Sequence, residues 1–343
     1  MRAVKLTSPS TVTLEETPVP EPGPGEIRVK VAGAGLCHSD LHLIGMGDAW
    51  PAFGITLGHE GAGYVDALGS GVTGHDIGAP VIVNLLWSCG DCRACVEGRD
   101  NACEVAGGRD DFPTTPGISL NGSMADYVIA PARHVLPLGD IDPVGAGPLT
   151  DAGLTPMHAI NSVRRRLTPG ATVVILGIGG LGHVGLQIVK AISAARVIAI
   201  DNDEKKLAHA AELGADLTFA PGPDTAAQIL ELTGGYGADV VLDFVGVQPT
   251  VDTAAAVIAP EGLVRLVGLG GGTFPMRAVG LAPWGVDVQR SYGGTRSDLL
   301  EVLALAAAGK IRIDYTTYPL EDFQRAIDDL HDGRVIGRAV LVP

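Results

Sequence analysis

A cysteine and a histidine near the N-terminus have the types and spacing of metal ligands. Cys37 opens the run CHSDLH, and His59 lies 22 positions later in GHEGAG. A catalytic zinc ion needs three protein ligands, and a thiolate and an imidazole supply two of them. Asp151, in the run LTDAG, is the candidate for the third, although Asp also commonly caps helices. Either Cys37 or His59 taken singly is more often an ordinary buried residue, so the prediction depends on the motifs below.

Four further cysteines lie within one short stretch and have the spacing C-x2-C-x2-C-x7-C. They are Cys89, Cys92, Cys95 and Cys103. Two-residue gaps allow thiolates to converge on one ion, and four thiolates fill a tetrahedral zinc completely, which predicts a structural zinc. An iron–sulfur cluster is the alternative, because it also uses closely spaced cysteines.

A glycine-rich turn follows an apolar run in the second half of the chain. The run ATVVIL, residues 171–176, predicts a buried strand and leads into Gly177-x-Gly179-x-x-Gly182, with Gly180 and Leu181 inside the turn. Asp201 follows at the end of the next predicted strand. This context indicates a dinucleotide site, in which the glycines admit a pyrophosphate and the acid binds the adenosine ribose. The charge of Asp201 would repel a 2′-phosphate, which favours NAD over NADP. A structural Gly-rich turn is the alternative.

The hydrophobic pattern divides the chain into a β-rich part and an alternating part. After residue 153 the pattern predicts strands at 171–176, 196–200, 240–244 and 263–267 and helices at 183–195, 207–213 and 250–258. This alternation predicts a doubly wound α/β domain. Near the C-terminus it predicts helices at 297–308, with Ser297 as N-cap and Gly309 as stop, and at 321–330, then a strand at 338–342. We therefore expect a cofactor domain at 153–292 and a catalytic domain at 1–152 and 293–343, with a zinc lobe at 88–104.

The composition narrows the class of protein and its partners. The chain has 343 residues, of which 46% are hydrophobic and 18% charged, so two packed domains are expected. A net charge of −15 argues against nucleic acid and anionic membranes as partners. The sequence shows no apolar run long enough to span a membrane and no signal-peptide pattern at its start, which predicts a cytoplasmic protein. In that compartment five cysteines indicate metal ligands or free thiols.

Together these motifs resemble the zinc-dependent alcohol dehydrogenases of the medium-chain dehydrogenase/reductase family. The matching stretches are CHSDLH, GHEGAG, the four-cysteine lobe, GIGGLGHVG and Asp201. The resemblance extends over essentially the whole chain and is strongest to bacterial secondary-alcohol dehydrogenases and phenylacetaldehyde or aryl-ketone reductases. It implies a β-rich GroES-like catalytic domain, a Rossmann NAD-binding domain and two zinc ions per subunit. The implied activity is that of an NAD-dependent alcohol dehydrogenase, class EC 1.1.1 and most closely EC 1.1.1.1.

The resemblance also implies roles for residues around the metal. Cys37, His59 and Asp151 bind the catalytic zinc, where many relatives have Cys in place of Asp151. Glu60 is a nearby carboxylate that can reach the metal, and Asp40 orients the histidine ligand. Ser39 takes the substrate proton and passes it toward His42. The residues implied to contact the cofactor outside the glycine-rich turn are His38, Thr155, Lys206, Val245, Gly268, Leu269 and Arg338.

The substrate side is less readable from the sequence. Candidate pocket residues are Trp50, Phe53, Leu120, Trp284 and Gly293, although ordinary core packing is at least as common for such side chains. Their apolar character favours secondary and also primary alcohols, ketones and aldehydes with apolar or aryl groups. The alternatives are a polyol or threonine-type dehydrogenase of the same family and a zinc- and NAD-binding redox sensor without turnover. A homodimer or homotetramer is expected. The sequence does not define the physiological substrate, the stereopreference or the preferred direction.

Overall fold

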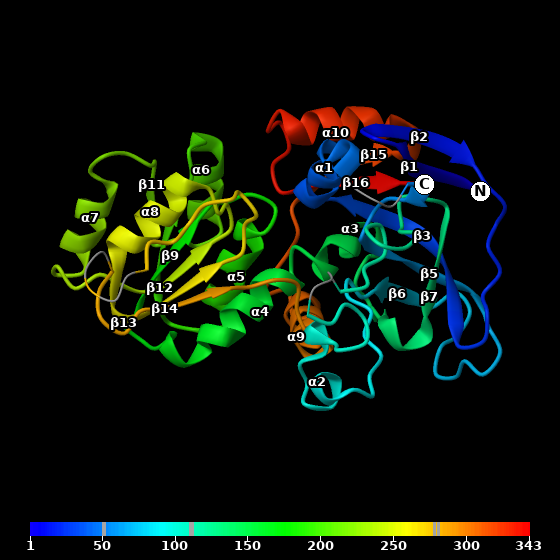
Figure 1. Ribbon diagram of the computed structural model, residues 1–343, viewed down its shortest axis with the longest axis horizontal. Coiled ribbons are helices and arrows are strands. Elements are labelled where there is room, and N and C mark those ends of the chain that lie inside the picture. Colours follow the sequence, from blue (N-terminus) through cyan, green and yellow to red (C-terminus); the bar gives the residue numbers. More distant parts are fainter. Residues whose placement is uncertain (50–52, 110–112, 277–278, 280–281) are drawn as a thin grey trace. The chain divides into compact units, whose positions relative to one another are not determined.

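The computed structural model describes residues 1–49, 53–109, 113–276, 279 and 282–343, and its backbone divides into two compact units. Unit 1 consists of Met1–Leu154, Gly293–Ala307 and Ile313–Pro343. Unit 2 consists of Thr155–Tyr292 and Ala308–Arg312. Figure 1 labels most of the helices and strands of both units.

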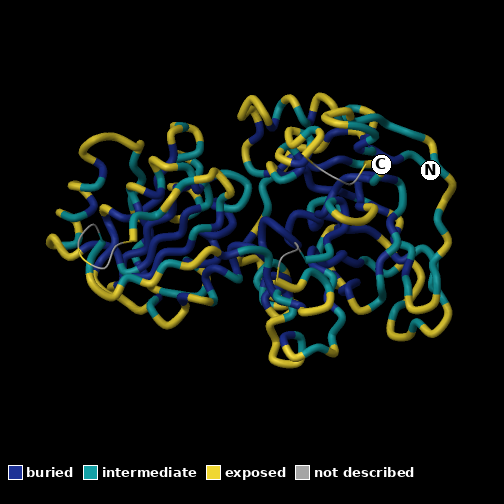
Figure 2. Tube along the Cα trace, viewed as in Figure 1, coloured by how far each residue is buried: buried dark blue, intermediate teal, exposed yellow. Residues whose placement is uncertain are grey.

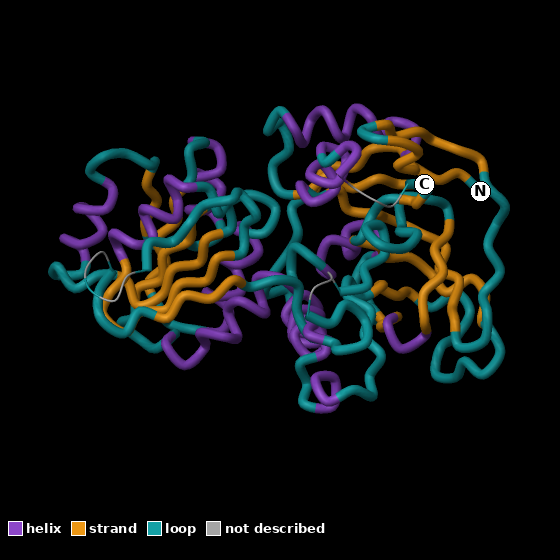
Figure 3. Tube along the Cα trace, in the orientation of Figure 1, coloured by secondary structure: helices purple, strands orange, loops and turns teal. Residues whose placement is uncertain are grey.

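Unit 1 is built on β-sheets with short helices at their margins (Figure 3). Its strands are β1 (Arg2–Ser8), β2 (Thr11–Glu16), β3 (Glu26–Leu36), β4 (Ile55–Thr56), β5 (Glu60–Leu68), β6 (Pro80–Val83), β7 (Tyr127–Pro131), β8 (Val135–Pro137), β15 (Tyr315–Pro319) and β16 (Arg338–Val342). Its helices are α1 (His38–Gly45), α2 (Arg93–Val96), α3 (Pro143–Ala146), α9 (Arg296–Ala307) and α10 (Phe323–His331). The larger sheet has the order β15-β16-β3-β5-β6-β8, with β7 also paired to β3, and the smaller one has the order β2-β1-β4.

The central strand β3 shows why this segment forms a half-buried sheet. Ile27, Val29 and Val31 alternate with Arg28 and Lys30, and the three apolar side chains are at most 5% exposed. They join one apolar core with residues of β1, β5, β7 and β16. In Figure 2 the paired strands of this unit run largely through its dark blue, buried part. The core therefore fixes β3 and β5, which lead into the candidate metal ligands.

The N-cap of helix α9 lies two residues earlier than the sequence suggested. Ser297 was the expected N-cap, but the helix starts at Arg296 and Ser297 is inside it. Thr295 caps the helix instead, because its Oγ1 accepts from the amide of Asp298 at 3.1 Å. The Asp298 carboxylate accepts in return from the Thr295 amide at 2.9 Å. This reciprocal pair is a capping box, with Asp as its acidic member.

Unit 2 contains a parallel sheet of six strands with helices between them. The strands are β9 (Thr172–Leu176), β10 (Arg196–Ile200), β11 (Leu217–Phe219), β12 (Ala238–Asp243), β13 (Ile258–Leu266) and β14 (Asp287–Arg290). The helices are α4 (Leu154–Val163), α5 (Gly182–Ile192), α6 (Glu204–Glu212), α7 (Thr225–Leu232) and α8 (Gln248–Val257). The sheet order is β11-β10-β9-β12-β13-β14, and all pairs are parallel. The predicted doubly wound α/β fold beside a β-rich domain is confirmed.

The alternating pattern located most strands and helices of unit 2 and missed others, among them the ten-residue helix α4. The strand predicted at 196–200 is observed as Arg196–Ile200, whereas the helix predicted at 183–195 ends at Ile192. The sequence analysis did not propose β11, β14, α4 or α7. The three residues of β11 are only partly buried, so their apolar pattern is weak. Among the described residues, every helix is too short or too polar to span a bilayer.

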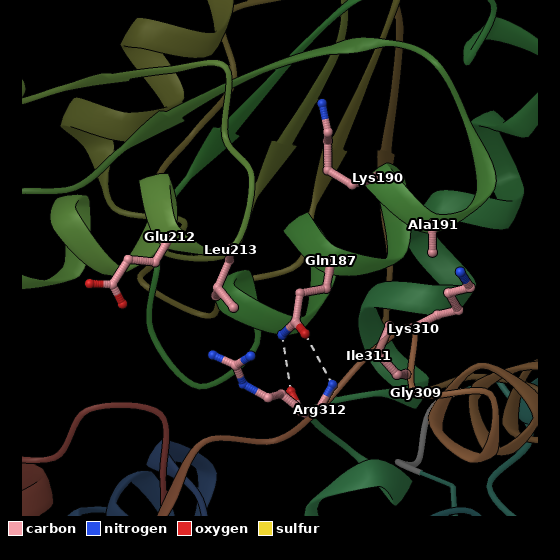
Figure 4. Close-up of a pocket in the computed structure, with 9 residues that line it drawn as sticks. All are labelled: Gln187, Lys190, Ala191, Glu212, Leu213, Gly309, Lys310, Ile311 and Arg312. Carbon is pink, nitrogen blue, oxygen red and sulfur yellow. Dashed lines mark hydrogen bonds between the residues drawn. The ribbon is translucent and has the colours of Figure 1, made fainter.

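Unit 2 also carries a pocket of about 380 Å³ beside helix α5 (Figure 4). Residues 187, 190 and 191 of α5, 212 and 213 at the end of α6, and 309–312 line it. The amide of Gln187 donates to the Arg312 carbonyl at 3.0 Å and accepts from the Arg312 amide at 3.0 Å. Lys190 pairs with Asp216 at 3.0 Å. These polar groups already have partners. The pocket therefore marks the place where residues 309–312 pack against α5.

Candidate active site

Four potential metal ligands converge inside unit 1. Single ligand atoms of Cys37, His59, Glu60 and Asp151 all lie within 4.8 Å of one another. The Cys37 Sγ is 3.3 Å from Asp151 Oδ2, and His59 Nε2 is 3.8 Å from the same oxygen. All four residues are buried. Separations of this size match ligands placed about 2.0–2.3 Å from one tetrahedral zinc.

Strand pairing and tight turns bring these residues together. Cys37 follows the end of β3, while His59 and Glu60 begin β5, and the β3–β5 register pairs Gly35 with Glu60. A Cβ on Gly35 would lie 1.8 Å from the Glu60 carboxylate, so only glycine leaves room for that side chain. Asp151 comes from the turn before α4, where its amide donates to the Pro148 carbonyl at 3.1 Å.

Asp40 holds both Cys37 and His59. Its Oδ2 accepts from the Cys37 amide at 2.9 Å, which caps the N-terminus of α1. Its Oδ1 lies 3.4 Å from His59 Nδ1, and Asp40 is fully buried. Burial would lower the pKa of His59, but the charge of Asp40 and hydrogen bonding to Asp151 raise that pKa well above its usual value. A carboxylate on Nδ1 leaves Nε2 directed to the metal position, as in other metal-bound histidines.

A buried arginine completes the cluster from the far end of the chain. Arg338, at the start of β16, is 2% exposed and pairs with Asp151 at 2.7 Å and with the Glu60 carboxylate through Nε and Nη2. Burial raises the pKa of Glu60 to about 7, although Arg338 opposes this shift. The resemblance implied a place for Arg338 near the cofactor pyrophosphate, which stays a prediction. The sequence reading missed its pairing with Glu60, because 278 residues separate the two.

The donor chemistry of this cluster fits a zinc ion. A thiol, an imidazole and two carboxylates share a space from which water is largely excluded, and Arg338 contributes one positive charge to them. Buried carboxylates and thiolates need cations to offset the cost of burial. A divalent ion held by Cys37, His59 and Asp151 would supply that charge, while Arg338 engages Glu60.

The four remaining cysteines form a second cluster in unit 1. The Sγ–Sγ distances are 3.4 Å for Cys92–Cys95, 3.6 Å for Cys89–Cys103, 3.9 Å for Cys92–Cys103 and 4.0 Å for Cys89–Cys95. These values approach the ~3.8 Å edge of a tetrahedron with 2.3 Å Zn–S bonds. The cysteines are free thiols in the structure. The set therefore fits a closed structural zinc.

Backbone amides around this lobe are arranged to receive thiolates. The Cys89 and Ala106 amides donate to Cys103 Sγ, both at 3.3 Å, and the Glu104 amide donates to Cys92 Sγ at 3.4 Å. Hydrogen bonds from backbone amides lower the pKa of Cys92 to about 6. The thiolate is the form that binds metal.

Two residues that the sequence reading missed attach the lobe to the sheet. Arg133 donates to the carbonyl of Cys89, and His134 Nε2 lies 3.0 Å from the Ser88 carbonyl. The imidazole of His134 also stacks on Trp87, with ring centroids 6.1 Å apart. Burial lowers the pKa of His134 to about 4. Arg133 and His134 belong to no motif comparable to the spaced cysteines, so the sequence analysis did not identify them.

The glycine-rich turn in unit 2 leaves space for a cofactor phosphate. Gly177 has φ +88°, and a Cβ on Gly182 would lie 1.8 Å from the Gly177 carbonyl oxygen. A Cβ on Gly179 would meet no atom within 4 Å. Gly177 and Gly182 are thus required by the geometry of the turn itself, whereas Gly179 leaves space for a ligand to approach the backbone. An open approach at the N-terminus of α5 is where a pyrophosphate is bound in dinucleotide folds.

Asp201 stands at the end of β10 beside this turn. Its Oδ2 accepts from the Ile178 amide at 2.7 Å, and its Oδ1 accepts from the Asp203 amide at 3.0 Å. It therefore fixes the turn as well as offering a carboxylate to a ribose. Of the other residues expected near the cofactor in unit 2, Thr155 is buried, Lys206, Val245 and Gly268 are half-buried, and Leu269 is exposed.

The residues expected in the proton path and the substrate wall differ in their exposure. Ser39 Oγ lies 3.6 Å from Cys37 Sγ, and His38 and His42 are exposed on α1. Phe53 and Leu120 are about two-fifths exposed, Trp284 is three-quarters exposed, and Gly293 has φ +49°. Trp50 lies outside the described residues.

A GroES-like sheet domain with a mixed-donor metal cluster, joined in one chain to a dinucleotide-binding fold, defines a zinc-binding dehydrogenase. Residues 23–140 match the family described as alcohol dehydrogenase GroES-like domain, and residues 180–308 match the family described as zinc-binding dehydrogenase. The chain belongs to this family of zinc-dependent alcohol dehydrogenases, whose cofactors are zinc and NAD(H).

Individual relatives span the whole chain. An NAD-dependent alcohol dehydrogenase of Sulfurisphaera tokodaii is 35% identical over 355 aligned positions, covering 100% of this chain and 99% of that protein. A D-arabinose 1-dehydrogenase (NADP(+)) of Saccharolobus solfataricus is 33% identical, covering 97% and 94%.

Solved structures share the complete fold. The crystal structure of an alcohol dehydrogenase from Aeropyrum pernix superposes with a TM-score of 0.91 at 35% identity and full coverage of both chains. An acetophenone reductase from Geotrichum candidum in complex with NAD has a TM-score of 0.87 at 30% identity, covering 100% of this chain and 97% of that one.

Proposed function

We propose that this chain interconverts secondary alcohols and ketones, and also primary alcohols and aldehydes, that carry apolar or aryl groups. The reaction catalysed would be that of EC 1.1.1.1. The observation that carries the proposal is the buried convergence of Cys37, His59 and Asp151 in unit 1. Similarity to an acetophenone reductase supports the aryl-ketone side of the proposal.

In this proposal the catalytic zinc is held by Cys37, His59 and Asp151, and a second zinc by the four-cysteine lobe. Bound zinc would supply Lewis-acid polarisation of the substrate oxygen, and NAD(H) would accept or supply the hydride. Glu60 is the remaining member of the four-residue cluster, and Arg338 engages its carboxylate. Asp40 fixes the ring of His59 through Nδ1.

The residues of helix α1 move the proton in this proposal. Ser39, half-buried beside Cys37, takes the proton of the alcohol hydroxyl during oxidation. His42 is three residues further along the same helix, one turn away, and is exposed. It can therefore pass the proton to water. In carbonyl reduction the same groups return a proton to the new alcohol.

The cofactor is assigned to unit 2 and its preference to Asp201. The open approach at Gly179, with Gly180 and Leu181 beside it, would receive the pyrophosphate. Asp201 would accept hydrogen bonds from the ribose hydroxyls and would repel the 2′-phosphate of NADP. His38, Thr155, Lys206, Val245, Gly268, Leu269 and Arg338 are proposed as further cofactor contacts.

The substrate wall is assigned to the apolar candidates named from the sequence. They are Trp50, Phe53, Leu120, Trp284 and Gly293. We also propose that the enzyme is cytoplasmic and that it forms a homodimer or homotetramer. Light scattering on the purified protein would test the oligomeric state.

The experiment for this function is NADH oxidation with a panel of carbonyl substrates, before and after zinc removal by a chelator. We expect turnover of acetophenone-like and medium-chain ketones that disappears with zinc and returns when zinc is added back. Turnover of sugars or polyols alone would favour the second candidate function, which similarity to the D-arabinose dehydrogenase supports. Bound zinc without any turnover would favour a redox sensor and would overturn the proposal.

A further inference from the structure

A buried carboxylate in unit 2 has contacts that the mechanism above does not use. Asp243 ends β12 and is fully buried. In the sheet order β11-β10-β9-β12-β13-β14, strands β9, β10 and β11 follow one another toward one edge of the sheet, and β12, β13 and β14 follow one another toward the other edge. Open parallel sheets bind their ligands beyond the carboxyl ends of the strands at such a switch point. Asp243 therefore stands at the edge where the proposed cofactor binds.

The side chain of Asp243 fixes the loop that follows its own strand. Its Oδ1 accepts from the amides of Val245 at 2.9 Å and Gly246 at 2.8 Å. Its Oδ2 accepts from the hydroxyl of Thr250 at 2.8 Å, in the first turns of α8. Burial raises the pKa of Asp243, and the two amides and the hydroxyl oppose that shift.

The backbone of Asp243 fixes the next loop as well. Its carbonyl accepts from the amides of Val267 at 2.8 Å and Gly268 at 3.0 Å, directly after β13. One residue therefore receives five hydrogen bonds, all from segments at the carboxyl edge of the sheet. Two of the donors, Val245 and Gly268, are proposed neighbours of the cofactor.

The two loops also interlock with each other. A Cβ on Gly268 would lie 2.2 Å from the carbonyl carbon of Val245, and the Gly270 amide donates to the Val245 carbonyl at 3.2 Å. Val245 also packs on the glycine-rich turn, where a Cβ on Gly177 would lie 2.4 Å from its Cγ2. Because the backbones of the two loops approach so closely, neither loop can move far without displacing the other.

We propose that Asp243 is a positioning residue that sets the loops carrying Val245 and Gly268 against the nicotinamide end of the cofactor. This inference rests on the proposed NAD-dependent function. The adenosine end relies on a separate carboxylate, Asp201, at the end of β10. Loss of the Asp243 acceptor should therefore weaken only the nicotinamide end, because a few tenths of an ångström there disturb the hydride geometry.

The variants separate this role from general stability. Asp243→Ala leaves two buried amides without their acceptor, whereas Asp243→Asn keeps an oxygen at the Oδ1 position and turns an amide donor toward Thr250. Asp239→Ala is the matched control, because Asp239 lies on the same strand near its other end and accepts from the Thr172 amide at 2.8 Å. Thr250→Val removes the Oδ2 partner alone and serves as a milder second variant.

The readouts are the dissociation constants of NADH and ADP-ribose, measured by titration of the holoenzyme, together with kcat and Tm. ADP-ribose lacks the nicotinamide, so it reports the adenosine end alone. For Asp243→Ala we expect NADH to bind about 10–100-fold more weakly, kcat to fall, and ADP-ribose to bind within about threefold of wild type. Asp243→Asn and Asp239→Ala should bind NADH within about threefold of wild type.

Two outcomes would overturn the inference. One is an Asp243→Ala enzyme that loses only thermal stability while NADH affinity and kcat remain near wild type. The other is an equal loss of NADH and ADP-ribose affinity, which would show general loosening of unit 2. If Asp243→Ala fails to fold, Thr250→Val must show a selective loss of NADH affinity of clearly more than about threefold, and its absence counts against the inference. A wild-type enzyme that does not bind NADH would instead refute the proposed function on which the inference rests.

Discussion

The two metal clusters of unit 1 use different donors and different surroundings. The cluster of Cys37, His59, Glu60 and Asp151 is buried, mixes sulfur, nitrogen and oxygen, and is contacted by the buried side chains of Asp40 and Arg338. The lobe of four cysteines is mostly half-buried and surrounded by backbone amides that donate to sulfur. Four thiolates saturate a zinc ion, whereas three mixed ligands leave a position for substrate. The difference indicates that one cluster serves chemistry and the other serves folding.

Breaking the mixed cluster should have the largest effect on turnover. Cys37→Ser removes the only thiolate of the mixed cluster. We expect kcat to fall by at least ~10³-fold, because the metal contributes several kcal/mol to stabilisation of the transition state. We expect the variant to remain folded, with turnover reduced far more than the thermal unfolding temperature. Steady-state NADH oxidation and calorimetry measure the two quantities.

The matched control is Cys103→Ser in the lobe. Here we expect the thermal unfolding temperature to drop by several degrees, about 5 °C or more, while turnover of the folded enzyme at low temperature stays within about tenfold of wild type. The comparison between the clusters fails if both substitutions lower activity and stability in the same proportion.

Removing the buried cation should have the next largest effect. Arg338→Met leaves the carboxylates of Glu60 and Asp151 without their partner, and breaking a buried ion pair in this way costs about 3–5 kcal/mol in the free energy of unfolding. Chemical denaturation of the purified variant measures the loss.

Arg334→Met provides the control for that measurement. Arg334 is more than half exposed and pairs with Asp329 and Asp332. Exposed ion pairs contribute about 0–1 kcal/mol, so this variant should remain close to wild type. Equal losses for the two arginine variants would contradict the role given to burial around the mixed cluster.

The smallest predicted effect is the pH dependence that His134, beside the four-cysteine lobe, gives to the free energy of unfolding. The folded protein holds the pKa of His134 at about 4, below the ~6.5 of an unfolded histidine. The unfolded chain therefore binds the proton first, so the contribution to stability is complete above pH 6.5 and is lost as the pH falls toward 4. The loss is about 3 kcal/mol, from ~1.4 kcal/mol per pKa unit. Arg133 and Arg296 face the imidazole and also disfavour its protonation.

His134→Asn should flatten this part of the stability profile between pH 7 and pH 4, as measured by denaturation at each pH. His331→Asn is the control, because His331 is largely exposed beside Asp332 on the surface. A profile for His134→Asn that remains parallel to that of wild type would show that other groups control the acid response.

Sequence patterns pointed to the members of the two clusters better than to the residues that contact them. Cys37, His59, Asp151 and the four lobe cysteines were recognisable because metal chemistry restricts residue type and spacing. The pairing of Arg338 with Glu60 depends on β16 lying beside β3, which no local pattern encodes. The start of α9 was misplaced for a related reason. The sequence analysis chose Ser297 as the cap, and the observed hydrogen bonds between Thr295 and Asp298 identify Thr295 instead.

Zinc content per chain, measured by elemental analysis on the Cys37→Ser, His59→Ala double variant, tests the central claim most directly. We predict two zinc ions per wild-type chain and one per double-variant chain, with the variant folded but without turnover. A double variant that retains two zinc ions, or that loses one and still turns over ketones, would contradict the assignment of the mixed cluster as the catalytic zinc site.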